Sequence, residues 1–262
     1  MILTVDIGNT TICVGGLEKD LQGAYAVGFT VRMDTVPGRS EEAYLAEMRA
    51  LLATVGMQAD AFTGAVLSSV VPALEAPLLN CARLLTGTEP VLVTAQSDTG
   101  LTVRLPEPDK VGRDRLVDAA WAAAHFPLPL VTVDMGTATT FNVVDADRVF
   151  LGGVIAPGIA TGLHALTGRT AQLPDVELKT PGHIIGRTTA ECMCSGAVAG
   201  TAAMVDGITA RIEAELGQPV TLVLTGGLAR YVEPLCTHPH TYDPDLLLKG
   251  LALLYERNAG KN

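Results

Sequence analysis

Apolar runs dominate the first forty residues and predict three β-strands. They cover residues 2–6, 12–17 and 26–32, and the triplet Gly8-Asn9-Thr10 separates the first two. Turn-forming residues between two β-rich runs are typical of a hairpin, not of a strand that leads into a helix. The chain is therefore predicted to open with a hairpin and a third strand.

Helical spacing of apolar positions begins after residue 40. Ser40 is a predicted N-cap, and the acidic residues that follow it suit the positive end of a helix dipole. A strand over 64–71, a helix from 72 to about 85 and a strand over 91–94 come next. The predicted order of the first half is βββαβαβ.

The same order begins again near the middle of the chain. The apolar run 130–134 ends in Met135-Gly136-Thr137, and predicted strands over 140–144 and 149–155 follow. Val5–Gly8 aligns with Val133–Gly136 at an offset of 128 residues, close to half the chain. The remaining predicted elements are helices over about 112–125, 190–216 and 245–258 and a strand over 221–224.

Length and composition agree with a duplicated globular protein. At roughly 150 residues per domain, 262 residues predict two modest domains, which we place at 1–113 and 114–262. The helix over 112–125 is expected to cross between them. An apolar content of 48% suffices for a packed core, and a charged fraction of 18% excludes disorder. The predicted fold is α/β, with two duplicated domains that each contain a mixed sheet flanked by helices.

The net charge of −10 argues against sequence-independent nucleic-acid binding, which depends on lysine and arginine. An anion such as ATP would have to bind locally, through backbone N–H groups and metal ions.

The most apolar stretch, 116–133, contains Asp118, His125 and two prolines and predicts no membrane span. The N-terminus lacks the basic segment of a signal peptide. We expect a cytoplasmic protein.

Cysteine and histidine residues show no metal-binding spacing. The five cysteines are scattered, which predicts reduced thiols in the core or at an interface. His238 and His240 flank Pro239 in a predicted loop, and no metal role is assigned to them. Arg32 and Thr35, which follow the third predicted strand, also receive no role.

The first hairpin contains the groups that a phosphate site needs. Asp6 ends a buried strand, where α/β folds gather their ligands. Gly8 lets the backbone approach a phosphate closely. The amides and hydroxyls of Asn9, Thr10 and Thr11 are able to donate to phosphate oxygens. Asp6 would hold a hydrated Mg²⁺ against the phosphates, because a carboxylate and a phosphate repel each other.

A second copy offers the same groups. Asp134, Gly136 and Thr137 repeat the pattern, and Thr225-Gly226-Gly227 follows another strand. One Asp-x-Gly-x-Thr alone is explained equally well as a tight turn, but two copies at half-chain separation favour a phosphate clamp. The chain has neither a G-x-G-x-x-G fingerprint nor a P-loop.

Duplicated hairpins of this type resemble the actin/hexokinase/Hsp70 superfamily, in which two ribonuclease-H-like domains surround ATP. Within it, the chain closely resembles the type III pantothenate kinases, over nearly its whole length and in the order of the family motifs. The matching segments are 6–10, 68–72, 112–115, 134–140, 152–158, 186–189 and 225–227.

This resemblance implies ATP-dependent phosphorylation of the primary hydroxyl of pantothenate, the first step of coenzyme A synthesis. The acid of the family's G-x-D-R motif is its general base and falls on Asp114. A carboxylate that accepts the hydroxyl proton suits phosphoryl transfer. The local alternative is that Asp114 only pairs with Lys110 or Arg115 at the start of a helix.

Further roles follow from the same resemblance. Asp134 matches the ligand of a monovalent cation (K⁺ or NH₄⁺), Thr137 an ATP contact and Thr189 a substrate contact. Residues 112–115 would cradle pantothenate, with the Arg115 guanidinium available to its carboxylate or to the transferred phosphoryl group. A homodimer formed through the second domain is also implied.

Two positions depart from the family pattern. Leu105 stands where a substrate-contacting Tyr is common, and Arg113 stands where a small residue is usual in the segment that begins with Gly112. Neither change touches the phosphate-binding residues. Two alternatives therefore stay open: a non-catalytic regulatory protein on the same fold, and an enzyme acting on another substrate, as a kinase or an exopolyphosphatase-like phosphatase.

Overall fold

The chain folds into two compact units in the computed structural model, which describes residues 1–262 except 22, 169–172, 175 and 261–262. Helix α3 (Arg113–His125) is divided between the units after Trp121. Each unit is assembled from separate stretches of chain, unlike the contiguous ranges 1–113 and 114–262. Unit 1 comprises Met1–Leu101, Pro106–Trp121 and Asp245–Asn262, and unit 2 comprises Thr102–Leu105 and Ala122–Pro244.

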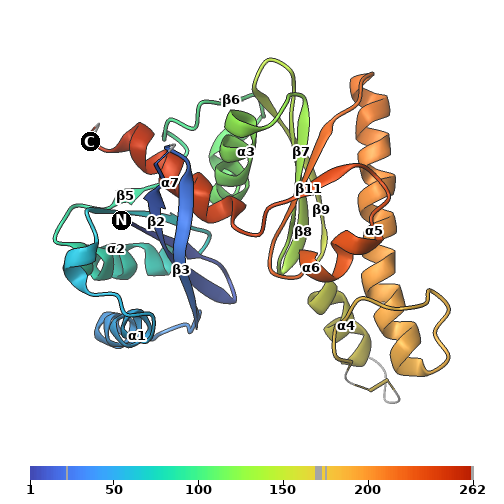
Figure 1. The fold of residues 1–262 in the computed structure, drawn as a ribbon, viewed down its shortest axis with the longest axis horizontal. Coiled ribbons are helices and arrows are strands. Elements are labelled where there is room, and N and C mark those ends of the chain that lie inside the picture. The colour runs from blue at the N-terminus through green and yellow to red at the C-terminus, as the bar shows by residue number, and fades with distance from the viewer. Residues whose placement is uncertain (22, 169–172, 175, 261–262) are drawn as a thin grey trace. The chain divides into compact units, whose positions relative to one another are not determined.

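Unit 1 is built on a five-stranded sheet in the order β3-β2-β1-β4-β5. Its strands β2, β3 and β5 are labelled in Figure 1. Neighbours β3, β2 and β1 are antiparallel, whereas β4 and β5 run parallel to β1. The predicted hairpin therefore forms, with its turn between β1 and β2. The strands are β1 (Ile2–Ile7), β2 (Thr11–Lys19), β3 (Tyr25–Asp34), β4 (Gly64–Ser69) and β5 (Val91–Leu92).

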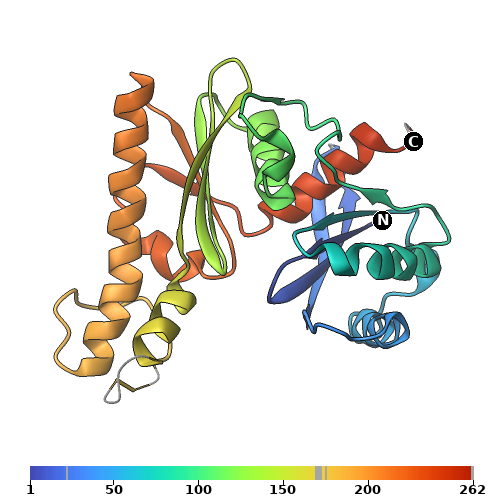
Figure 2. The same ribbon diagram turned by 180° about the vertical axis from the view of Figure 1, so that it is seen from behind.

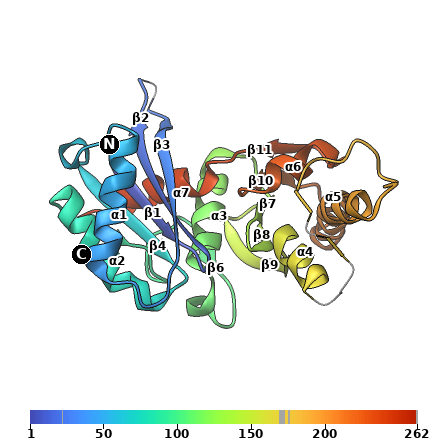
Figure 3. The ribbon, with the colours of Figure 1, turned by 90° about the horizontal axis from the view of Figure 1, so that it is seen from below.

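Alternate residues of the first sheet face two different helix layers. Leu3, Val5 and Ile7 of β1 join the core formed with α1 (Glu41–Thr54) and α2 (Pro72–Thr86). On the other face, Val66 of β4 packs with α3 and with α7 (Leu246–Asn258), and these layers lie on opposite sides of the strands in Figure 3. Strand side chains alternate between faces, so Asp6 and Ser68 share the face that α3 and α7 cover.

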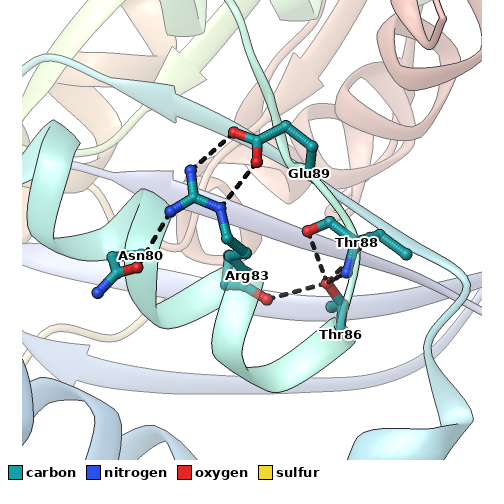
Figure 4. Close-up of polar contacts among 6 residues, drawn as sticks. Asn80, Arg83, Thr86, Thr88 and Glu89 are labelled. Atoms are coloured by element: carbon teal, nitrogen blue, oxygen red, sulfur yellow. Dashed lines mark hydrogen bonds and ion pairs between the residues drawn. The ribbon is translucent and has the colours of Figure 1, made fainter.

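Local signals fix the ends of the first two helices. The Ser40 hydroxyl accepts from the Ala43 amide at 3.3 Å, which confirms the predicted cap of α1. Helix α2 ends at Thr86, and its C-cap residue Gly87 has a left-handed φ of 67°. Just beyond it, the Arg83 guanidinium makes two hydrogen bonds of 2.7 Å to Glu89 (Figure 4). This contact lowers the pKa of Glu89 and holds the chain as it leaves the helix.

Unit 2 repeats the same sheet. Its order is β11-β10-β7-β8-β9-β6, and the strands β9-β8-β7-β10-β11 reproduce both the order and the directions of β3-β2-β1-β4-β5. The predicted duplication is therefore confirmed. The strands are β6 (Thr102–Val103), β7 (Leu130–Met135), β8 (Ala138–Val144), β9 (Val149–Pro157), β10 (Thr221–Thr225) and β11 (His240–Tyr242).

The long helix α5 (Thr189–Leu216) covers one side of the second sheet (Figure 2). Its residues Val198 and Val205 are fully buried against Val133 of β7. Helices α4 (Ile159–Thr167) and α6 (Ala229–Val232) complete this layer. Short 3₁₀ turns occur at Ala59–Ala61 (η1), Pro108–Lys110 (η2) and Glu233–Leu235 (η3).

Among the described residues, α5 is the one helix long and apolar enough to pass a length-and-composition test for a membrane span. A core helix of a soluble protein passes the same test, and several α5 side chains lie in the core of unit 2. This helix is therefore weak support for a span. All five cysteines are free thiols.

Four helices and strands were not predicted from the sequence: α4, α6, β6 and β11. His240 begins β11, so the expectation that it lies in a loop is wrong. Strand β11 has three residues and β6 has two, which is too short for an alternating pattern to show.

Candidate active site

The first hairpin closes tightly at Gly8. Its amide donates to the Thr11 carbonyl at 3.1 Å, and a Cβ at this position would lie 2.9 Å from that oxygen. Only glycine fits without a shift of the backbone. Asn9 and Thr10 at the tip are exposed, as a turn that binds a ligand requires.

Asp6 lies beside the hairpin and is oriented by a neighbouring strand. The buried Ser68 hydroxyl donates to Asp6 Oδ1 at 2.6 Å, because parallel pairing places Ser68 of β4 directly beside Asp6 of β1. Sequence reasoning noted the segment 68–72 but assigned it no contact. The pairing register, which joins residues 62 positions apart, is what reveals the contact.

Asp114 lies in the first turn of α3, and its carboxylate folds back over Gly112. The Arg115 amide donates to Asp114 Oδ1 at 2.9 Å, and a Cβ on Gly112 would lie 2.5 Å from the same oxygen. Burial raises the pKa of Asp114, against the opposing effects of that hydrogen bond and of the Arg115 charge. The carboxylate is therefore a stronger base than an exposed aspartate.

The charged residues near Asp114 in the sequence make contacts with their own close neighbours. Lys110 Nζ pairs with Glu107 at 2.6 Å, so this lysine is not the partner that the local alternative suggested. The Arg113 guanidinium donates to the carbonyls of Val111 and Asp109, at 3.1 Å each, and so supports the loop before α3. Burial lowers the pKa of Arg115, and the Asp114 charge opposes this effect.

The second hairpin is held by the start of α4. The Gly158 amide and the Thr161 hydroxyl both donate to the Thr137 carbonyl, at 3.1 and 2.7 Å. A Cβ on Gly158 would lie 2.3 Å from the Gly136 carbonyl oxygen and 2.4 Å from that of Thr137. Helix α4 and this hairpin therefore fit together only with glycine at 158. Sequence reasoning missed Thr161 because it did not predict α4.

Asp134 near the end of β7 lies against the Thr225-Gly226-Gly227 segment. Thr225 of β10 pairs with Asp134, and a Cβ on Gly226 would lie 2.3 Å from Asp134 Oδ1. Gly226 also has a φ of 96°, which disfavours any other residue. Two predicted motifs that are far apart in sequence thus meet at one carboxylate.

The two predicted substrate contacts of unit 2 have different surroundings. Thr189, the first residue of α5, lines a largely apolar cavity of about 530 Å³ together with Leu163 and Met193. Leu105 instead packs on Gly152 of β9, where a Cβ would lie 3.3 Å from its Cδ2. Leu105 is not among the residues that line this cavity.

Each unit therefore carries an aspartate next to a glycine hairpin, at equivalent places in a duplicated sheet. Unit 1 adds Asp114, which lies on the same side of its sheet as Asp6. This duplicated sheet with paired hairpins defines the class of the protein: it has the α/β fold of the actin/hexokinase type.

Comparison with known proteins gives the family. The profile of the type III pantothenate kinases matches residues 2–211. The type III pantothenate kinase of Rhodospirillum centenum is 40% identical over 100% of both chains. That of Thermomicrobium roseum is 38% identical over 98% of this chain and 97% of its own. The chain belongs to the type III pantothenate kinase family.

Solved structures agree on the fold. A Campylobacter jejuni protein described as a putative Baf family transcriptional activator aligns with a TM-score of 0.60 at 18% identity, over 98% of each chain. The ADPNP-bound activator of 2-hydroxyisocaproyl-CoA dehydratase from Clostridium difficile aligns with a TM-score of 0.50 at 12% identity, over 99% of this chain and 95% of its own. At these identities the likeness concerns the fold alone.

Proposed function

We infer that this protein transfers a phosphoryl group from ATP to the primary hydroxyl of pantothenate, the first step of coenzyme A biosynthesis. The observation that carries this inference is the placement of Asp114, a half-buried carboxylate on the same side of the sheet as Asp6, in a chain of this family. Phosphoryl transfer asks the protein mainly for positioning and for charge neutralisation.

Asp114 is the proposed general base. Its Oδ1 is occupied by the Arg115 amide, so Oδ2 is the oxygen that we expect to face the substrate hydroxyl. Burial keeps the pKa of this carboxyl raised, which strengthens proton acceptance. Gly112 allows the carboxylate to lie back in this position.

The two hairpins are the proposed ATP site. Residues 8–11 in unit 1 and Gly136, Thr137, Gly226 and Gly227 in unit 2 would contact the nucleotide. Asp6 is the residue that we expect to hold Mg²⁺, which supplies neutralising charge to the phosphates when bound. One carboxylate oriented by Ser68 suits an ion that keeps most of its water ligands.

Asp134 is the proposed ligand of a monovalent cation, K⁺ or NH₄⁺. Its carboxylate lies against the backbone of Gly226 and beside Thr225, and carboxylate oxygens suit a hard cation. No group of three or more His, Cys, Asp or Glu that could hold a metal ion occurs in the part of the chain that the structure describes. This agrees with ions held by single carboxylates and by ligands from outside the protein.

Pantothenate is expected to contact Gly112, Arg115, Thr189 and Leu105. Arg115 is the proposed partner for the substrate carboxylate. Arg113 would act through the loop that its guanidinium supports. Leu105 offers an aliphatic surface to the methyl groups of pantothenate but no hydroxyl, so a related hydroxylated substrate is the second candidate.

A direct assay tests this function. Purified protein with ATP and Mg²⁺ is expected to release ADP only when pantothenate is added, with turnover in K⁺ or NH₄⁺ and little in Na⁺, and none after EDTA. Turnover in Na⁺ equal to that in K⁺ would remove the cation role of Asp134. Nucleotide binding without pantothenate-dependent turnover would contradict the proposed substrate and favour the regulatory alternative or another acceptor.

We also propose that the protein is a cytoplasmic homodimer that associates through unit 2. Ile155, Ile184 and Ile185 of this unit are 63%, 64% and 84% exposed, which is costly for isoleucine in water. Light scattering is expected to give twice the chain mass of 27.3 kDa. Ile185→Glu should shift the mass toward the monomer, whereas Leu84→Glu, at an exposed leucine of unit 1, should not. A wild-type monomer at micromolar concentration would contradict the proposal.

A further inference from the structure

Thr35 makes two hydrogen bonds to the backbone of the first hairpin. It follows the last residue of β3, and its amide donates to the Thr10 carbonyl at 3.0 Å. Its hydroxyl donates to the Gly8 carbonyl at 2.7 Å. The Gly8 amide already donates to Thr11. The carbonyls of Gly8, Thr10 and Thr11 are therefore all engaged by donors of the protein.

These contacts also set the direction of the hairpin amides. In a planar trans peptide, the C=O of one residue and the N–H of the next point in opposite directions. When Thr35 draws the Gly8 carbonyl toward itself, the Asn9 N–H points away from Thr35. The hydrogen bond from the Thr35 amide to the Thr10 carbonyl likewise makes the Thr11 N–H point away from Thr35.

The position of Thr35 is itself fixed. The next residue, Val36, makes two hydrogen bonds of 3.0 Å with the Tyr44 hydroxyl. The Val36 amide donates to this hydroxyl, and the hydroxyl donates to the Val36 carbonyl. Tyr44 is fully buried in α1, within the core of unit 1. Thr35 is thus attached to the core through its neighbour.

We propose that Thr35 is a positioning residue for nucleotide binding, which keeps the hairpin carbonyls turned inward and the Asn9 and Thr11 amides turned toward the phosphates. This inference rests on the proposed ATP site at residues 8–11. A carbonyl released from Thr35 is free to rotate toward the bound anion and to repel it, and the amide of the same peptide then turns away. The hydroxyl is essential because a hydrocarbon side chain of the same shape has no donor.

Three threonine variants separate this role from a structural one. Thr35→Val keeps the shape and the backbone N–H but removes the hydroxyl, and Thr35→Ser keeps the hydroxyl. Thr30→Val, at an exposed position of β3, is the matched control. Loss of the single hydrogen bond and of amide alignment is expected to weaken Mg·ADP binding in Thr35→Val by about tenfold. Thr35→Ser should restore most of the affinity, and Thr30→Val should bind like wild type.

Isothermal titration with Mg·ADP measures the affinity without any acceptor. In turnover assays, the KM for ATP should rise in Thr35→Val, while the KM for pantothenate and the unfolding midpoint stay close to wild type. Equal affinity of Thr35→Val and wild type, or equal weakening in Thr35→Ser, would overturn the inference. If Thr35→Val does not fold, Thr35→Ala provides the same comparison. A wild-type protein that fails to bind Mg·ADP would instead overturn the proposed function.

Discussion

Asp114→Asn is expected to reduce kcat by about 10²- to 10⁴-fold, the usual contribution of a general base. Asparagine keeps the shape of the side chain and the oxygen that accepts from the Arg115 amide, but its amide cannot take the proton of the substrate hydroxyl. Steady-state ADP release measures the loss. Mg·ADP affinity, measured by titration, should change little because the phosphate hairpins are untouched.

The pH dependence of kcat/KM is a second test of the role of Asp114. The basic form of Asp114 is the deprotonated one, so kcat/KM should fall as the pH drops through its pKa, which burial raises above that of an ordinary carboxyl. The acid limb of the wild-type profile should therefore lie above the pH range in which exposed aspartates titrate. The residual activity of Asp114→Asn should lack this limb.

A matched control is available five residues away. Asp109 is exposed in η2, and the contact that Arg113 makes to it uses its backbone carbonyl, which survives substitution. Asp109→Asn should keep normal turnover. Near-normal turnover of Asp114→Asn would exclude Asp114 as the base, and equal losses in both variants would indicate a general charge effect instead.

The stability of the folded protein should depend on pH in the opposite direction to its activity. Because the folded-state pKa of Asp114 is raised, folding favours its protonated form, and its contribution to the free energy of unfolding falls as the pH rises through that pKa. At neutral pH the charge on the half-buried Asp114 carboxylate costs stability. Asp114→Asn removes this cost, so its unfolding midpoint should equal or exceed that of wild type, and a catalytic loss cannot then be ascribed to unfolding.

Periodicity and turn chemistry predicted most of the architecture. The Gly8 hairpin, the Ser40 cap and the restart of the pattern at residue 130 all depend on neighbours within a few residues, and all three are present. The duplicated strand order follows from this repeat. The G-x-D-R segment was identified through the resemblance to the family, and its residues lie at the start of α3.

Contacts that depend on pairing between distant segments could not be predicted from the sequence. The Ser68–Asp6 bond requires the register of β1 and β4, and the two bonds of Thr35 require knowledge of where β3 ends beside the hairpin. Arg113 is a further example. Its charge suggested a substrate contact, which stays a prediction, whereas its two hydrogen bonds to backbone carbonyls within four residues were not predicted.

Helix α4 was missed because its apolar residues directly continue those of β9, with Pro157 and Gly158 between them. This junction underlies the second large effect that we expect. Gly158→Ala should reduce kcat/KM for ATP by about 10²-fold, because a 1 Å misplacement of catalytic geometry has this order of cost. Alanine suits the backbone at 158, where φ is −67°, so the effect comes only from the contact with the second hairpin.

Gly162→Ala is the matched control, one turn further along α4. A Cβ at Gly162 would have no heavy atom within 4 Å, and alanine in a helix interior is more stable than glycine by about 0.5–1 kcal/mol. This variant should therefore keep its affinity for ATP and unfold at an equal or higher temperature. In Gly158→Ala, by contrast, the methyl group would meet two carbonyl oxygens at less than 2.5 Å, so either the hairpin or α4 must move.

The two variants carry the same chemical change on the same helix, so their difference isolates the hairpin. Titration with Mg·ADP should show weaker binding for Gly158→Ala alone. Normal binding by Gly158→Ala would mean that the hairpin at Gly136 and Thr137 does not contact the nucleotide. Weaker binding by both variants would mean that α4 as a whole, through its packing on α5, controls the site.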